Sequence, residues 1–304
     1  MLSRIAESLY WIGRYVERAE DTSRLLDVHL NLLLEDPWAP EDVVCASLFA
    51  AMGKDVDTDV TRVDVLDQLA WDRGYPGSIV GSIGVARENA RRSREVISTE
   101  LWESINVTWH DAIMGTRRAR PHAFFTWVRE RAAGFNGIAD ATLSRDEPYH
   151  FLVLGRSLER ADMTARLVAA RALTGSAGPS WVTLLQSCGA YQAFLRSSRG
   201  AIEDARAAEF LLLDPLFPRS LMSSLVSAER CLDDLTEPSR GDRADQAHRV
   251  LGMIRSELEF APTAELFEDL YHLMERVQSA CSVASDAVTR RYFPRGVVTE
   301  WAVS

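Results

Sequence analysis

The sequence contains very little lysine and no long apolar run. Lys54 is its only lysine, and the net charge is −10 at pH 7. A protein that binds duplex nucleic acid needs many cations facing the phosphates, so this balance argues against general nucleic-acid binding. A transmembrane helix needs about 18 or more consecutive apolar residues, and no run of that length occurs. We therefore expect neither nucleic acid nor a membrane as a partner.

Cysteine is also scarce, and the cysteines are not paired in the sequence. The chain has 304 residues and four cysteines, and none of them forms a Cys-x-x-Cys motif: Cys45, Cys188, Cys231 and Cys281. So few cysteines do not make a disulfide scaffold, which predicts a reducing, cytoplasmic location. Their apolar neighbours indicate core packing. Arg4 and Glu7 interrupt the apolar pattern near the N-terminus, so we expect no signal peptide.

The apolar residues repeat at helical spacing almost everywhere. Apolar residues make up 47% of the chain and charged residues 26%, which is enough apolar surface for a sizeable core. Strand-like alternation is scarce, so we predict an all-α protein, a multi-helix bundle or array in a single domain over residues 1–304. The pattern predicts single helices over residues 78–109, 181–198 and 263–292, among others.

An internal repeat is the strongest pattern in the sequence. Residues 9–26 and 151–168 align without a gap, and Gly13 then stands over Gly155, an offset of 142 positions. Both copies share the Gly-Arg pair, the Glu-Arg-Ala triplet, a threonine and a closing Arg-Leu. Such agreement indicates an internal duplication, with two pseudo-equivalent halves.

Each predicted half begins with a long helix that carries one copy of the repeat. These helices are expected over residues 3–34 and 148–173. Small residues lie in the middle of both apolar seams, Ala19 with Ser23 in the first and Ala161 with Ala165 in the second. Small side chains let helix axes approach closely, so we predict that the two repeat helices contact each other.

The charges that the two copies share form the candidate site. They are Arg14, Glu17, Arg18 and Arg24 in the first copy, and Arg156, Glu159, Arg160 and Arg166 in the second. Three interpretations stay open: a solvated helix face, a buried structural ion network and a ligand-binding site. An exposed pair four residues apart stabilises a helix by only a few tenths of a kcal/mol. Buried charges are usually paired, and ion-pair networks also arise without a function.

A second group of arginines follows later in the chain. Arg87, Arg91 and Arg94 share one face of an expected helix, with Glu88 and Glu95 beside them. The functional interpretation is an anion clamp for phosphate or carboxylate. The alternative is a solvated face of exposed ion pairs, which are common and weak, and we favour it.

Metal and cofactor motifs are incomplete or missing. A dimetal site in a helix bundle uses Glu-x-x-His motifs, and the approximate matches are Glu147-x-x-His150 and Asp269-x-x-His272. A proline follows Glu147, and Asp269 replaces the glutamate. There is no His-Glu-x-x-His motif and no phosphate-binding glycine loop. We therefore expect no metal and no cofactor.

Several separated motifs resemble one known family. They lie at residues 8–20, 86–91 together with 97–98 and 102–103, 155–162, 210–220 and 292–293. The first reads Ser-Leu-Tyr-Trp-Ile-Gly-Arg-Tyr-Val-Glu-Arg-Ala-Glu, and together they resemble the alpha-E domain family over the whole chain. The resemblance implies an entirely helical fold.

The resemblance also implies a context. Alpha-E proteins are found in bacterial operons with an atypical ATP-grasp protein and a transglutaminase-like protein, so partners of these two kinds are expected. The implied function is a helical accessory or substrate-presenting component of a system that forms or modifies peptide or amide bonds. Two alternatives remain: a catalytic protein that uses the Arg/Glu network of the duplicated helix, and a purely structural partner that stabilises the ATP-grasp protein.

Overall fold

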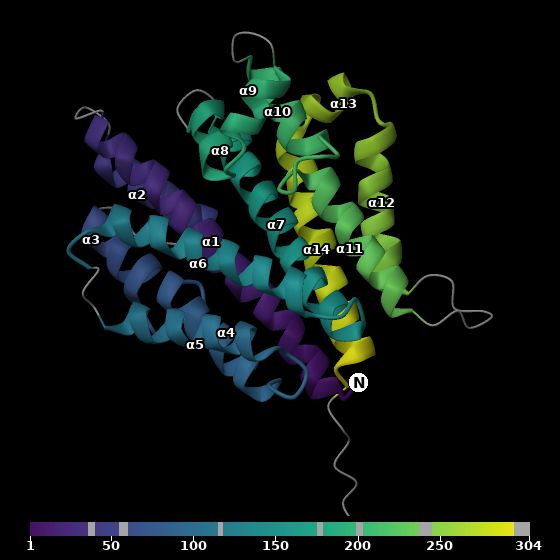
Figure 1. Ribbon diagram of the computed structural model, residues 1–304. Coiled ribbons are helices and arrows are strands. Elements are labelled where there is room, and N and C mark those ends of the chain that lie inside the picture. Colours follow the sequence, from purple (N-terminus) through teal and green to yellow (C-terminus); the bar gives the residue numbers. More distant parts are fainter. Residues whose placement is uncertain are drawn as a thin grey trace, which may run out of the picture.

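The computed structural model describes residues 1–35, 40–54, 60–114, 118–174, 179–198, 203–236 and 245–294. Within these ranges every regular element is a helix, and one of them is a short π-helical segment (Figure 1). The prediction of an all-α fold is confirmed. None of the described helices combines the length and the apolar composition that a bilayer crossing requires.

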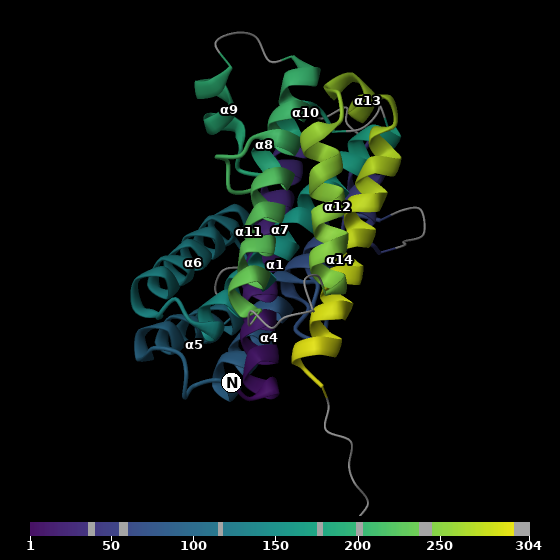
Figure 2. The same cartoon turned by 90° about the vertical axis from the view of Figure 1, so that its right-hand side faces the viewer.

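Helices α1 (Ser3–Glu35) and α7 (Glu147–Thr174) lie at the centre and pack against each other (Figure 2). Their bounds differ by one residue at most from the predicted ranges 3–34 and 148–173. The predicted contact between the two repeat helices is confirmed. Both are covered by other helices on most sides, which explains why apolar residues occupy more than one face of each.

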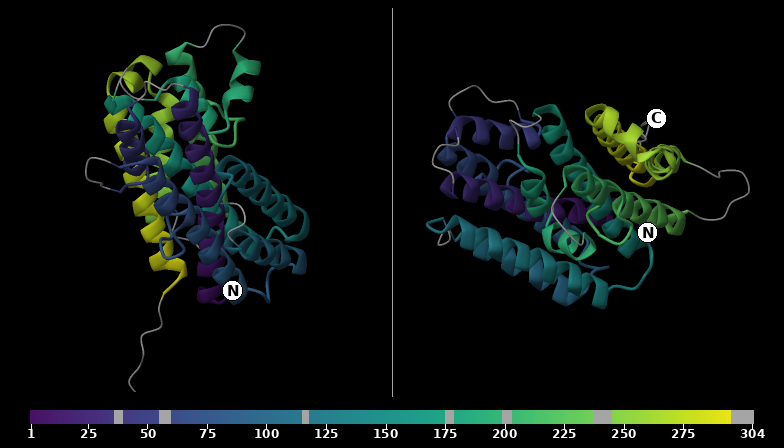
Figure 3. Two further views of the ribbon diagram at one scale, coloured as in Figure 1. Left: turned by 90° about the vertical axis from the view of Figure 1, so that its left-hand side faces the viewer. Right: turned by 90° about the horizontal axis from the view of Figure 1, so that it is seen from above.

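Each central helix has a corresponding set of neighbours. Helix α1 packs against α4 (Ile79–Arg92) and α6 (Pro121–Thr142), and α5 (Thr99–Ile113) packs on both of these. Helix α7 packs against α11 (Leu221–Leu235) and α14 (Leu270–Tyr292), and α12 (Gln246–Phe260) packs on both of these. Figure 3 shows the two sets on opposite sides of the central pair.

Short helices connect these sets. They are α2 (Glu41–Ala51), α3 (Arg62–Val65), the π-helical segment η1 (Leu66–Trp71), α8 (Trp181–Ser187), α9 (Tyr191–Ser197), α10 (Asp204–Leu213) and α13 (Thr263–Glu268). Helix α2 follows α1 but also contacts α7, and α8 follows α7 but also contacts α1. The two sets are therefore linked in both directions across the central pair.

Equivalent positions make equivalent contacts well beyond the repeat found in the sequence. Ser78 caps α4 and its hydroxyl also donates to the carbonyl of Asp72. At the same offset of 142, Ser220 caps α11 and its hydroxyl donates to the carbonyl of Asp214. The duplication itself stays an interpretation of the sequence, and these matched contacts favour it.

The sequence predicts one helix over residues 78–109, and the structure has two. Helix α4 ends at Arg92, and Ser98 begins α5 by accepting a hydrogen bond from the backbone N–H of Leu101 at 3.1 Å. The helical spacing of apolar residues continues across this break, which is why periodicity alone did not reveal it.

Two other ranges predicted as single helices are also interrupted. Residues 181–198 are broken at Gly189, whose φ of 63° is left-handed and ends the first segment. Residues 263–292 are broken at Asp269, whose φ and ψ of −134° and 52° are not helical. The four cysteines are unpaired and buried in the core, as predicted.

Candidate functional site: a buried ion network and a neighbouring cleft

The backbones of α1 and α7 touch at the two glycines of the repeat. A Cβ atom on Gly13 would lie 2.0 Å from the carbonyl oxygen of Leu152, and one on Gly155 would lie 2.0 Å from that of Tyr10. Because glycine has no Cβ, the helices can come this close. The sequence predicts a close approach at the small residues Ala19 and Ala161. The backbone contact at the glycines lies about two turns earlier in each helix and was not predicted.

Glu159 of α7 lies between two arginines of α1. Its Oε2 accepts from the Nε of Arg14 at 2.5 Å, and its Oε1 accepts from the Nε of Arg18 at 2.5 Å. The Glu159 side chain is only 2% exposed. Burial opposes ionisation, but the two guanidinium groups outweigh it and hold the pKa of Glu159 at about 2. Glu159 is therefore an ionised, fully paired carboxylate.

Glu17 of α1 has the corresponding place on the other side of the contact. Its Oε1 accepts from Arg160 Nε at 2.6 Å and from Arg219 Nη2 at 2.6 Å. Burial raises its pKa, and the charges of Arg160 and Arg219 lower it by more, so the net direction is down. Its Oε2 is buried and has no hydrogen-bond partner within the described residues.

The two sides of the network are not identical. Arg156 is the counterpart of Arg14, but its Nη1 donates to Asn136 at 3.2 Å instead of reaching Glu17. Arg219, from the segment before α11, takes that place at Glu17. The counterpart of Arg219 at the offset of 142 is Gly77. One half therefore has a cation in this network that the other half lacks.

Asp21 lies on the same side of the network as Glu17 and Arg219. Its Oδ1 accepts from Arg219 Nε at 3.3 Å, while its Oδ2 is buried without a partner in the described part of the chain. Burial and the negative charge of Glu17 raise the pKa of Asp21 well above its usual range, although Arg219 opposes this. The counterpart of Asp21 is Met163, so this acid too is present on one side only.

The remaining candidate arginines pair with acids four residues earlier. Arg24 Nη2 lies 2.7 Å from Glu20 Oε1, and Arg166 Nε lies 2.8 Å from Asp162 Oδ2. Arg219 Nη2 also reaches Glu20, at 2.8 Å. The four-residue spacing predicts both i,i+4 pairs, and both are partly shielded from solvent.

A left-handed glycine lies against each of these two guanidinium groups. A Cβ atom on Gly189 would lie 2.8 Å from Arg24 Nη1, and one on Gly53 would lie 2.9 Å from Arg166 Nη1. The φ angles of these glycines are 63° and 68°. The ends of α2 and α8 thus shield the outer ends of the network.

The structure contradicts a solvated face for the repeated charges. Arg14, Glu17 and Glu159 are buried, and each of the other five candidate arginines has at least one hydrogen bond or ion pair. Arg219 and Asp21 were missed as site residues. Arg219 lies in a motif that carries the family resemblance, but the counterparts of both residues are uncharged, so the repeat gave no signal for them.

The later arginines do not form one clamp. The guanidinium groups of Arg87 and Arg94 lie over Trp102, 5.7 and 4.9 Å from the ring centroid. Arg91 instead pairs with Glu88 at 2.8 Å on an exposed surface. Arg91 fits the favoured interpretation of a solvated Arg/Glu face.

The residues of the two metal-like motifs are occupied by other contacts. Glu147 accepts from the N-terminal ammonium at 3.0 Å, and His150 Nδ1 lies 3.4 Å from an Asp234 oxygen. Asp269 and His272 form an exposed hydrogen bond of 2.6 Å. In the described ranges, no three His, Cys, Asp or Glu side chains are grouped to hold a metal ion.

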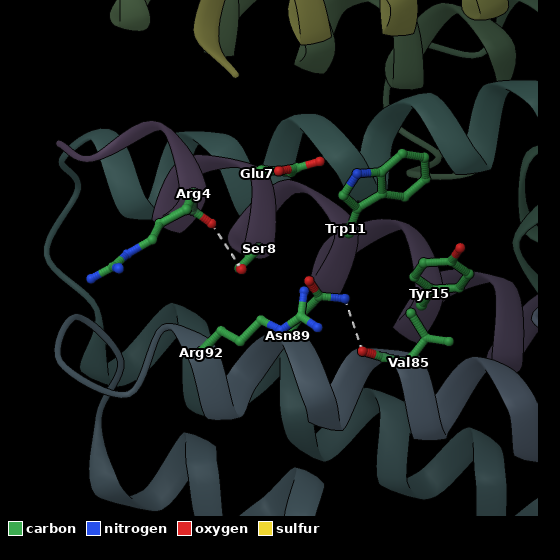
Figure 4. Close-up of a pocket in the computed structure, with 8 residues that line it drawn as sticks. All are labelled: Arg4, Glu7, Ser8, Trp11, Tyr15, Val85, Asn89 and Arg92. Atoms are coloured by element: carbon green, nitrogen blue, oxygen red, sulfur yellow. Dashed lines mark hydrogen bonds between the residues drawn. The ribbon is translucent and has the colours of Figure 1, made fainter. Parts of the chain in front are cut away.

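A cleft of about 600 Å³ lies beside the network, between α1 and α4. Figure 4 shows Trp11 and Tyr15 of α1 at one end of it and Arg4 at the other, with Arg92 extending from α4 toward Asn89 between them. Tyr15 connects the cleft to the network, because the Arg18 guanidinium lies 5.0 Å from the centroid of its ring. No pattern in the sequence indicates this cleft.

Residues 1–293 match the sequence model of the Alpha-E family, described as a predicted alpha-helical domain with a conserved ER motif. The chain belongs to the Alpha-E family. Two Glu-Arg pairs, Glu17-Arg18 and Glu159-Arg160, lie in the buried network of this Alpha-E protein. Each pair contributes a buried carboxylate and an arginine that reaches the carboxylate of the opposite helix.

Three uncharacterised mycobacterial proteins are similar over almost the whole chain. One is from Mycobacterium bovis and two are from strains of Mycobacterium tuberculosis, each 24% identical over 335 residues. The match covers 98% of this chain but 38% of each relative, so more than half of each relative lies outside it. No solved structure matches the chain.

Proposed function

We propose that this Alpha-E protein is a helical accessory component that presents a substrate within an ATP-grasp-linked system forming or modifying peptide or amide bonds. The observation that carries the proposal is the difference between the buried ion network and the neighbouring cleft. The repeated charges are paired inside the protein, whereas the cleft between α1 and α4 is open. The network therefore serves as a scaffold, and the cleft is where a ligand binds.

The protonation state of the network supports a scaffold. A general acid or base works best when its pKa lies near the operating pH and when it can reach a substrate proton. The pKa of Glu159 is about 2, and both of its oxygens accept from arginines. Arginine stays protonated at any physiological pH and cannot serve as a base. These groups suit fixing two helices rather than transferring protons.

The length of the relatives supports an accessory role. Their chains are much longer than the matched region, so a unit similar to this one occurs there joined to other sequence. A unit of this kind is expected to act together with another domain or protein. An ATP-grasp protein would supply the ATP-dependent activation of a carboxylate, and this chain would hold the molecule to be joined.

One observation favours the catalytic alternative. Asp21 is buried, its Oδ2 has no partner in the described part of the chain, and its pKa is raised well above the usual range. A carboxylic acid that keeps its proton can act as a general acid. The catalytic alternative therefore depends on Asp21 rather than on the repeated glutamates.

The test combines the purified chain with an ATP-grasp protein from the same genome. Sedimentation velocity measures complex formation, and ADP release is measured with peptide acceptors present. The proposal expects a complex, no ADP release by the chain alone, and faster release when both proteins are present.

The other outcomes identify the alternatives. A higher melting temperature of the ATP-grasp protein with an unchanged rate would indicate a purely structural partner. Turnover by the isolated chain that Asp21→Asn abolishes would establish the catalytic alternative. No complex and no change in rate would contradict the proposed function.

A further inference from the structure

The cleft differs sharply from the equivalent place in the other half of the molecule. Positions 8 and 92 of the cleft are Ser8 and Arg92, and their counterparts at the offset of 142 are His150 and Asp234. His150 and Asp234 lie 3.4 Å apart and join α7 to α11. No such pair joins Ser8 to Arg92: the Ser8 hydroxyl donates to the carbonyl of Arg4 in its own helix.

A second pair of positions repeats the contrast. Tyr15 and Val85 line the cleft, and their counterparts are Ser157 and Ser227. The Ser157 hydroxyl donates to the Ser227 hydroxyl at 2.9 Å, again across the two helices. Direct polar contacts thus join α7 to α11, whereas the corresponding pair α1 and α4 has a cleft between its helices. The residue differences between the two halves therefore account for the cleft between α1 and α4.

One end of the cleft is aromatic. The Trp11 and Tyr15 rings lie 5.6 Å apart between centroids with planes tilted by 33°, and both side chains are partly exposed. At the counterpart positions stand Val153 and Ser157, which offer no such wall. Adjacent partly exposed rings bind apolar or aromatic groups through their faces.

The other end of the cleft is cationic. Arg4 of α1 lies at this end and Arg92 of α4 extends from it toward Asn89 in the middle of the cleft (Figure 4), and both are exposed. Within the described residues, no carboxylate lies within ion-pair distance of Arg4, and the one ion pair of Arg92 joins its Nε to Glu88 at 3.2 Å. A guanidinium group whose N–H donors are not all used can bind a carboxylate in a bidentate geometry, through two hydrogen bonds.

Hydrogen-bond acceptors lie between the two ends. The Asn89 side-chain nitrogen donates to the carbonyl of Val85, and its side-chain oxygen stays available as an acceptor among the described residues. Glu7 also lines the cleft, and its carboxylate has no ion-pair partner in the described part of the chain. These acceptors suit the N–H groups of a peptide backbone, and the charge of Glu7 disfavours a doubly charged phosphate.

We propose that the cleft binds the C-terminal residue of a peptide, with its carboxylate on Arg4 and Arg92 and an apolar side chain on Trp11 and Tyr15. The assignment of a peptide as the source of this carboxylate rests on the proposed function. A volume of about 600 Å³ fits one to a few residues, since ligand sites commonly span about 300–1,000 Å³.

The test is calorimetric titration of the isolated full chain with the tripeptide acetyl-Ala-Ala-Phe carrying a free carboxylate. The C-terminal amide of the same peptide and inorganic phosphate are titrated in parallel. We expect the free acid to bind at least about tenfold more tightly than the amide, and more tightly than phosphate.

The variants Arg4→Gln and Arg92→Gln should each weaken binding of the free acid by about tenfold. Arg91→Gln is the matched control, because Arg91 is a neighbouring exposed arginine that pairs with Glu88 and does not line the cleft. It should leave the affinity unchanged. Melting temperatures of all three variants should equal that of the wild type, so that a loss of binding does not reflect unfolding.

Equal affinity for acid and amide, tighter binding of phosphate, no binding of the peptide, or equal effects of all three variants would overturn the proposal. The outcome is separable from the proposed function because the titration needs no partner protein. Peptide binding without a complex with the ATP-grasp protein would keep this site and contradict the accessory role. A complex without peptide binding would keep the accessory role and contradict this peptide site.

Discussion

The α-carbon of Gly13 lies against the carbonyl oxygen of Leu152, so close that a Cβ atom would be 2.0 Å from it. Gly155 makes the reciprocal contact with Tyr10. This pair of contacts sets the separation of α1 and α7, and it brings Glu17 and Glu159 within reach of arginines on the opposite helix. The ion network depends on this spacing.

Replacing Gly13 by alanine should therefore destabilise the protein. The new methyl group meets backbone atoms, which cannot rotate away, so the two central helices must separate. We expect a loss of at least about 1–3 kcal/mol in the free energy of unfolding, measured by denaturant titration. Gly134→Ala is the matched control, because a Cβ there has nothing within 4 Å. It should stabilise the protein by about 0.5–1 kcal/mol, since alanine is the better helix former. Equal effects of the two substitutions would contradict the close contact.

The sequence predicted the fold well because one signal dominates it. In helices as buried as α1 and α7, apolar residues recur at helical spacing and the repeat marks both helices. The interruptions at Ser93–Ser98, Gly189 and Asp269 were missed because each lies in a continuous apolar pattern. Backbone contact at Gly13 was missed because a glycine next to an arginine gives no apolar signal.

The candidate site was predicted only as far as the two copies agree. Glu17 and Glu159 stand out because they match across the repeat. Asp21 and Arg219 have Met163 and Gly77 as counterparts, so comparing the copies hid them. The cleft was hidden for a similar reason, because Trp11 and Tyr15 are typical of core packing until the contacts of the other half are seen.

Removing the charge of Glu159 should be costly at neutral pH. Glu159→Gln leaves Arg14 and Arg18 without their shared anion in the interior, which typically costs about 3–5 kcal/mol. The pKa of Glu159 is lowered to about 2, so its stabilising contribution is present above the usual glutamate range and is lost as the pH falls toward about 2. Denaturant unfolding of both proteins between pH 2 and 7 should show the difference shrinking as the pH falls.

The control for this prediction is Glu88→Gln. The pKa of Glu88 is also about 2, but its side chain is 38% exposed. Solvent screens an exposed pair, so this substitution should change stability by less than about 0.5 kcal/mol. A similar small effect at Glu159 would indicate that burial does not strengthen the pairing.

Asp21 should show the opposite dependence on pH. Its pKa is raised in the folded protein, so its contribution is fully present below the usual aspartate range and is lost as the pH rises through the raised value. Asp21→Asn cannot ionise and keeps an acceptor for Arg219. The variant should gain stability relative to the wild type as the pH rises from 4 to 8. A variant less stable by the same amount at every pH would show that Asp21 is ionised and satisfied.

The repeated Arg/Glu residues hold α1 and α7 together in the interior, and this is the central claim to test. A double-mutant cycle with Arg18→Gln and Glu159→Gln measures this most directly, because these residues lie on different helices and their side chains meet at 2.5 Å. Unfolding free energies of the wild type, the two single variants and the double variant give the coupling energy. We predict a coupling of at least about 1.5 kcal/mol. A coupling below about 0.5 kcal/mol, as found for exposed ion pairs, would contradict the claim.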